Sequence, residues 1–146
     1  MLLGTRMNGM EEHREGIDEI GQRIVTALAG FEEIKQLVLF GSLARGAGRA
    51  DSDVDLAVDA GSPLTPEQKI AMIEALALAL NRPVDLIDLG TAGQPLLTQI
   101  VTTGRRLLGS DSDWAAVIYR NIMDNEDFVP LQRRILKARQ QAWIKH

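Results

Sequence analysis

One stretch of the sequence, GSLARGAGRADSDVDL at positions 41–56, constrains the fold more than any other part of the chain. The six residues before it, Lys35–Phe40, read KQLVLF, a β-favouring run that stops at Gly41 and indicates a buried strand. At its end, Asp53–Asp59 alternates polar and apolar residues with the period of two that is typical of a strand. We therefore expect two strands joined by a glycine-rich loop, with Gly-Ser closing the first and Asp-Val-Asp opening the second.

The other segments predict helices and two further strands. Residues 11–31 repeat apolar residues at spacings of three and four, as an amphipathic helix does. Thr65 is the expected N-cap of a second helix, Pro66 suits its first position, and Gln68 completes a capping box. The buried stripe of that helix is expected at Ile70, Ile73, Leu76, Ala77 and Leu80, and the helix is expected to end at residues 81–83.

Towards the C-terminus the sequence predicts further strands and helices in turn. Val84–Leu89 indicates a third strand, Gln94–Thr103 a short helix and Arg105–Leu108 a fourth strand. Asp111–His146 predicts two helices broken near Pro130. In the first of these, the residues expected to face inward are Trp114, Val117, Ile118 and Ile122.

This order predicts an α/β (α+β) fold, with a small mixed β-sheet flanked by helices and C-terminal helices beyond it. At 146 residues we expect one domain over 1–146, with 1–10 as a flexible N-terminus and 111–146 as a C-terminal helical extension. The longest apolar runs are far short of the ~20 residues of a membrane span. Without a cysteine or a signal-peptide pattern, the sequence favours the cytoplasm. The net charge of −4 argues against direct nucleic-acid binding.

Two carboxylates are expected to share one face of the second strand. Asp53 and Asp55 are two residues apart, so their Cα atoms lie about 6.6 Å apart on the same side. Their mutual repulsion favours a cation between them, and Mg²⁺ is the natural candidate because it prefers carboxylate oxygens and keeps positions open for phosphate. The pattern predicts a site for one or two Mg²⁺ ions.

The end of the first strand offers complementary groups for phosphate. Gly41 lets a phosphate approach the backbone, and Ser42 supplies a hydroxyl and an amide at the expected start of a helix. Arg45, one turn further on, carries a forked and permanently charged group for the same phosphates. Together these residues predict a nucleoside triphosphate site beside the metal.

A third carboxylate is expected from the strand at Val84–Leu89. It contains Asp85 and Asp88, which point to opposite faces because they are three residues apart. Only one of them can join the site, and we favour Asp85, with Asp88 at the exit of the strand. Asp85 would help to deprotonate the acceptor of the transferred group.

The Gly41-Ser42 pair, ten residues and then Asp53-Val54-Asp55 resemble the signature of the DNA polymerase β-like nucleotidyltransferase superfamily. The short length is similar to its minimal nucleotidyltransferases (MNT), which are commonly the antitoxins of HEPN/MNT toxin–antitoxin pairs. The resemblance implies triphosphate contacts at Gly41 and Ser42, and metal ligation by Asp53, Asp55 and Asp85. It also implies transfer of AMP from Mg-ATP to a hydroxyl, with a tyrosine of a partner HEPN toxin as acceptor.

Two other functions stay open on the sequence alone. A non-catalytic antitoxin would neutralise its toxin by direct binding alone. A small-molecule (antibiotic) nucleotidyltransferase would use the same motif, although the chain lacks a second domain for an acceptor pocket.

Overall fold

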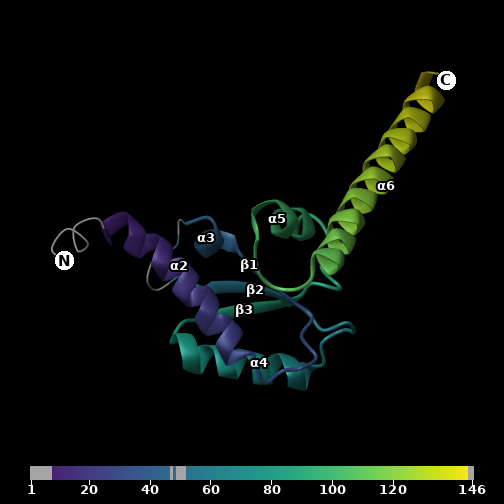
Figure 1. The fold of residues 1–146 in the computed structure, drawn as a ribbon. Helices are drawn as coiled ribbons and strands as arrows, with labels where there is room; N and C mark the ends of the chain where they lie inside the picture. The colour runs from purple at the N-terminus through teal and green to yellow at the C-terminus, as the bar shows by residue number, and fades with distance from the viewer. Residues whose placement is uncertain (1–7, 47, 49–51, 145–146) are drawn as a thin grey trace.

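The computed structural model describes residues 8–46, 48 and 52–144, with the side chains of residues 16, 18–46, 48, 52–125 and 136–140. Four strands form one sheet in the order β3-β2-β1-β4 (Figure 1). β1 is antiparallel to β2 and β4, whereas β2 and β3 are parallel. This confirms the predicted mixed sheet with flanking helices. The strands are β1 (Gln36–Phe40), β2 (Val54–Asp59), β3 (Val84–Asp88) and β4 (Arg105–Leu108).

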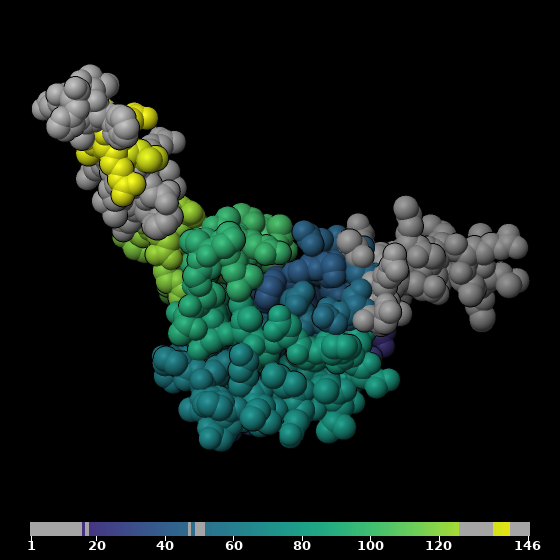
Figure 2. Space-filling model, turned by 180° about the vertical axis from the view of Figure 1, so that it is seen from behind, coloured from purple at the N-terminus to yellow at the C-terminus, as the bar shows by residue number. Residues whose placement is uncertain are grey.

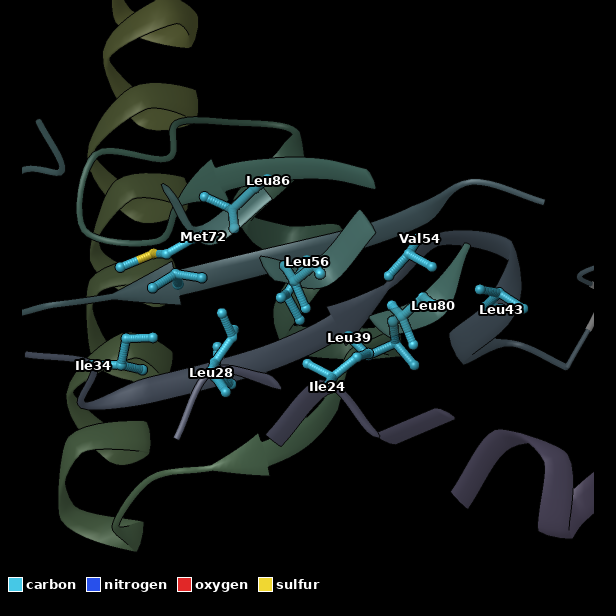
Figure 3. Packing of buried hydrophobic residues seen from close by; sticks show 13 residues of the cluster. Ile24, Leu28, Ile34, Leu39, Leu43, Val54, Leu56, Met72, Leu80 and Leu86 are labelled. Atoms are coloured by element: carbon cyan, nitrogen blue, oxygen red, sulfur yellow. The ribbon is translucent and has the colours of Figure 1, made fainter. Parts of the chain in front are cut away.

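Helices cover both faces of the sheet. Helices α2 (Asn8–Ala27) and α4 (Pro66–Leu80) pack on one face, where thirteen buried apolar residues form a cluster (Figure 3). On the other face, α5 (Leu96–Thr103) and the first part of α6 (Asp111–Ile144) cover a second cluster around Phe40, Ala57 and Val117. All five residues of β1 are buried because this central strand is covered on both sides.

The alternation along β2 decides on which side the acidic residues lie. Val54, Leu56 and Val58 belong to the cluster under α2 and α4, whereas Ala57 belongs to the cluster under α5 and α6. Side chains alternate between the faces of a strand, so Asp55 lies on the same face as Ala57. The candidate site is therefore on the α5 side of the sheet.

Helix α4 begins as predicted, and part of the predicted stripe faces inward. The backbone N–H of Thr65 donates to Gln68 Oε1 at 2.9 Å, and that of Gln68 donates to Thr65 Oγ1 at 3.1 Å, which confirms the capping box. Of the predicted stripe, Leu76 and Leu80 are buried and Ile73 packs against the same cluster, which confirms those positions. Ile70, which is 57% exposed, and the exposed Ala77 were predicted wrongly, and Met72 is buried in addition. Apolar residues occur on almost every side of this helix, so spacing alone could not fix its rotation.

Helix α6 runs as one helix of 34 residues through Pro130, so the predicted break was wrong. A proline inside a helix removes one backbone hydrogen bond and costs about 3 kcal/mol. The run of good helix formers after the proline, residues 131–142, offsets that cost. Of the residues predicted to face inward, Val117 is buried and Trp114 packs against the same cluster, but Ile122 is 47% exposed and Asn121 is buried next to it.

The N-terminal helix α2 begins at Asn8, so residues 8–10 of the predicted flexible segment are helical. The rest of that predicted segment, residues 1–7, lies outside the described residues. Within the described ranges, no helix combines the length and the apolar character that crossing a bilayer requires.

Candidate active site

Gly41 follows the last residue of β1 and begins α3 (Gly41–Ala44), and its backbone lies against the side chain of Asp55. Its φ of +77° lies in the left-handed region that side chains disfavour. A Cβ atom there would lie 3.0 Å from Asp55 Cγ and 3.2 Å from Asp55 Cβ, and closer still to Asp55 Oδ2. Both the conformation and the space require glycine, and the missing side chain lets the Asp55 carboxylate lie against the strand end.

Strand pairing places Asp55 between the other two motifs. In the register of the sheet, Asp55 is opposite Phe40, the residue before Gly41-Ser42, on one side. On the other side it is opposite Asp85 on the parallel strand β3. Residues from three separate parts of the sequence thus meet at one end of the sheet.

The three carboxylates interact electrostatically. The pKa of Asp55 is raised above its ordinary value, first because burial disfavours its charge, then through repulsion by Asp85 and by Asp53. Asp55 is half-buried, whereas Asp53 and Asp85 are exposed. Asp55 is therefore the desolvated centre of the cluster, with the other two carboxylates on its open side.

The chemistry of this cluster suits a divalent cation. Among the described side chains, no three of the types that bind metals stand close enough to hold an ion without adjustment. The donors are nevertheless hard carboxylate oxygens on adjacent strands, which Mg²⁺ prefers, and an ion would relieve the repulsion that raises the pKa of Asp55. The residues fit such an ion, and two exposed side chains can close on it.

Short helix α3 carries the predicted phosphate contacts. Ser42 is half-buried in its first turn, next to Gly41. Arg45 caps its C-terminus, where its backbone N–H donates to Gly41 O at 3.3 Å, and its side chain is exposed. Gly48 lies close to this helix, since a Cβ on Gly48 would lie 2.5 Å from Leu43 Cδ2. Ser42 and Arg45 are thus held on one turn beside the carboxylates.

Asp88 lies at the other end of β3 and has a structural role. Its carboxylate accepts hydrogen bonds from the backbone N–H groups of Leu64 and Gly90, both at 2.9 Å. These bonds hold the loops after β2 and β3. Of the two acidic residues on this strand, the structure places Asp85 beside Asp55.

Arg82 is a residue at this end of the sheet that the sequence pattern did not single out. It lies two residues before β3, and Pro83 O next to it accepts the backbone N–H of Val54 at 2.9 Å. That bond joins the start of β3 to the start of β2. The sequence does contain a signal for Arg82, because a basic residue stands just before the strand that carries the candidate Asp85.

Comparison with known proteins identifies the family. The model of the family described as "Polymerase beta, Nucleotidyltransferase" matches residues 22–113, which is more than half of the chain and includes every residue of the candidate site. The chain belongs to the polymerase β nucleotidyltransferase family. Gly41, Ser42 and the Asp-Val-Asp pair therefore lie within the matched domain of a nucleotidyltransferase.

The chain is also similar to individual proteins, among them a protein adenylyltransferase and the chains of solved toxin–antitoxin structures. The protein adenylyltransferase MntA of Shewanella oneidensis is 37% identical over 81 residues, which cover 56% of this chain and 58% of that protein. The chain thus spans little more than half of the curated relative's length in this match. A solved toxin–antitoxin structure with AMP-PNP superposes with a TM-score of 0.65 at 30% identity, covering 86% of this chain and 95% of its own.

A second solved structure extends the comparison. The tri-AMPylated HEPN toxin of Shewanella oneidensis in complex with its MNT antitoxin matches with a TM-score of 0.62 at 28% identity, over 88% of this chain and 96% of the other. These relatives share the fold of this nucleotidyltransferase over nearly the whole described chain.

Proposed function

We propose that this nucleotidyltransferase is an antitoxin that transfers AMP from ATP to a tyrosine hydroxyl of a partner HEPN toxin. The observation that carries the proposal is the contact of the Asp55 carboxylate with Gly41, which joins the acidic cluster to the Gly-Ser turn. The relatives named as adenylyltransferase and as the MNT antitoxin of a tri-AMPylated toxin support the same reaction. ATP as the donor is consistent with a cytoplasmic location.

The phosphate-binding residues and the acidic residues have separate roles in this transfer. Gly41 and Ser42 bind the β- and γ-phosphates through backbone N–H groups and a hydroxyl, and Arg45 neutralises their charge. Asp53, Asp55 and Asp85 would hold Mg²⁺, which supplies charge neutralisation at the phosphates. Positioning and electrostatic stabilisation account for most of the catalysis in such transfers.

The proposed transfer forms one P–O bond and breaks another. The tyrosine oxygen of the toxin attacks the α-phosphorus of ATP and forms a new P–O bond. The bond from the α-phosphorus to the bridging oxygen breaks, and pyrophosphate leaves. The phenolic proton passes to Asp85, which lies exposed on the open side of Asp55. The product is a toxin carrying one adenylyl group.

The test is mass spectrometry of a HEPN toxin after incubation with this protein, ATP and Mg²⁺. We expect the toxin to gain the mass of one or more adenylyl groups, and we expect none with Asp55→Asn. Asp88→Asn is the matched control, because its carboxylate binds loop amides away from the site. An unmodified toxin, or equal modification by Asp55→Asn, contradicts the proposal.

The Asp55→Asn variant also distinguishes an antitoxin that acts by catalysis from one that neutralises its toxin by binding alone. If Asp55→Asn still protects cells from the toxin as well as the native protein does, the antitoxin acts by contact, and the nucleotide site is not needed for that protection. Loss of protection together with loss of modification supports the enzymatic function.

A further inference from the structure

Helix α6 extends well past the point where its described side chains contact the rest of the protein. At about 1.5 Å per residue, its 34 residues make a helix roughly 50 Å long. Among the described side chains, its last hydrogen bond to another element joins Asn125 Nδ2 to Thr98 Oγ1, at 3.2 Å. The described side chains beyond that point, residues 136–140, are all exposed, and the helix projects from the body (Figures 1 and 2). A helix in a protein gains most of its stability from packing, so we expect the projecting part of α6 to pack against a partner.

The part of α6 that lies on the body also has an exposed apolar face. Tyr119, Ile122 and Met123 are 63%, 47% and 36% exposed, and their spacing of three and four residues puts them on one side of the helix. Leu136, on the projecting part, is 58% exposed and lies two heptads after Ile122. Residues at this spacing return to the same side of a helix that pairs with another.

The charges along α6 are divided in a way that indicates which partner fits. Residues 111–127 contain five acidic residues and one basic residue, Arg120. The guanidinium of Arg120 is already engaged, since it donates to Leu89 O at 2.6 Å and Gly90 O at 2.9 Å. Residues 131–144 contain four basic residues and no acidic one. Two copies of the helix placed antiparallel would bring each acidic half beside a basic half.

The apolar spacing gives the same arrangement independently. If residue 129 lies on the two-fold axis, Ile122 of one copy is opposite Leu136 of the other. In the sequence, Ala115, Val129 and Trp143 continue the seven-residue spacing on either side of that centre. The division of charge thus favours the antiparallel orientation and the apolar spacing favours this register, and a two-fold contact of this kind is self-complementary.

We propose that α6 is a dimerisation arm, which pairs antiparallel with α6 of a second copy of this chain about an axis near residue 129. The projecting half of each arm lies on the exposed face around Ile122 of the other copy. This inference does not depend on the proposed transfer of AMP, because it uses none of the residues of the active site.

The mass of the purified chain in solution tests the arm. Light scattering should give twice the 16.0 kDa of one chain. Ile122→Glu and Leu136→Glu should each reduce it to the monomer, with the helix content retained because both side chains are exposed. Leu78→Glu is the matched control, because Leu78 is 88% exposed but lies on α4, away from the proposed contact. This variant should stay dimeric. A monomeric native chain that associates only with a toxin overturns the proposal.

Charge reversal and cross-linking test the antiparallel register. Lys137→Glu/Arg139→Glu removes the net positive charge of residues 131–144, where two basic residues remain. Asp113→Lys/Asp124→Lys likewise removes the net negative charge of residues 111–127. Each variant alone should associate more weakly than the native chain, and an equal mixture of the two should pair more strongly than either. The chain has no cysteine, so Ile122→Cys and Leu136→Cys report proximity cleanly. A disulfide that forms in their mixture and not in either variant alone supports the register. Cross-linking within each single variant contradicts it.

Discussion

The Asp55 carboxylate occupies the space in front of Gly41 that the Cβ of any other residue would need. This relationship links the two halves of the sequence motif directly, across the pairing of β1 with β2. The Gly-Ser turn and the acidic cluster are consequently one structure, and a change on either side disturbs the other.

Gly41→Ala is therefore expected to destabilise the protein and abolish transfer of AMP. Gly46→Ala is the matched control: Gly46 has a similar φ of +74°, but a Cβ there would meet nothing within 4 Å. The left-handed backbone costs an alanine about 1–2 kcal/mol at either position. The clash with Asp55 should add about 1–3 kcal/mol at Gly41 alone. Urea unfolding measures the difference, and equal losses in both variants would show that the Asp55 contact is unimportant.

The strand–loop–strand unit and the start of α4 could be predicted because their signals are local. The alternation of Asp53–Asp59 and the pairing of Thr65 with Gln68 each act within a few residues. Strand periodicity predicts that only one of Asp85 and Asp88 joins the site, and the structure places Asp85 opposite Asp55. The roles of these acidic residues in holding metal stay predictions.

Features that depend on tertiary packing could not be predicted in the same way. The contact of Gly41 with Asp55 arises from the register of two strands, which no local pattern specifies. The burial of Asn121 depends on polar partners supplied by α5 and the residues just before it. The continuity of α6 through Pro130 reflects a balance between one lost hydrogen bond and a long run of helix formers.

The raised pKa of Asp55 predicts how stability changes with pH in a buffer containing a chelator. The unfolded chain titrates near the ordinary value of 3.8, and the folded chain above it. Between these values the folded protein binds more protons, so the contribution of Asp55 to stability falls as pH rises through this window. Asp55→Asn, which carries no charge, should be more stable than the native protein at neutral pH. The gap should close below pH 3.8, and a gap that is constant with pH would contradict an origin in the buried charge of Asp55.

Magnesium should reverse the order of these two proteins. An ion that binds only the folded state stabilises it by mass action, by about 2.7 kcal/mol at a concentration 100 times its dissociation constant. Thermal unfolding with and without Mg²⁺ should show this gain for the native protein and little or none for Asp53→Asn or Asp55→Asn. Asp88→Asn should lower the melting temperature through its lost loop bonds and still respond to Mg²⁺. A response to Mg²⁺ that survives in Asp55→Asn would place the ion elsewhere.

The buried Asn121 joins the base of α6 to α5 and to the residue Gln94 before it through two partly buried hydrogen bonds. Its Oδ1 accepts from Gln94 Nε2 at 2.7 Å and from Thr98 Oγ1 at 2.8 Å, and the residue is only 7% exposed. Asn121→Ala would remove both hydrogen bonds, and a typical intramolecular hydrogen bond contributes about 0.5–1.5 kcal/mol to stability. Urea unfolding measures this loss of stability.

Asn125→Ala is the control for this prediction. Asn125 is exposed, and its Nδ2 donates at 3.2 Å to Oγ1 of Thr98 on α5. Water can replace that bond, so the loss should stay below about 1 kcal/mol. Urea unfolding should therefore rank Asn121→Ala well below Asn125→Ala in stability. Since the network contains none of the three acidic residues of the site, both variants should retain the response to Mg²⁺; equal stability of the two would mean that the buried network does not hold α6 in place.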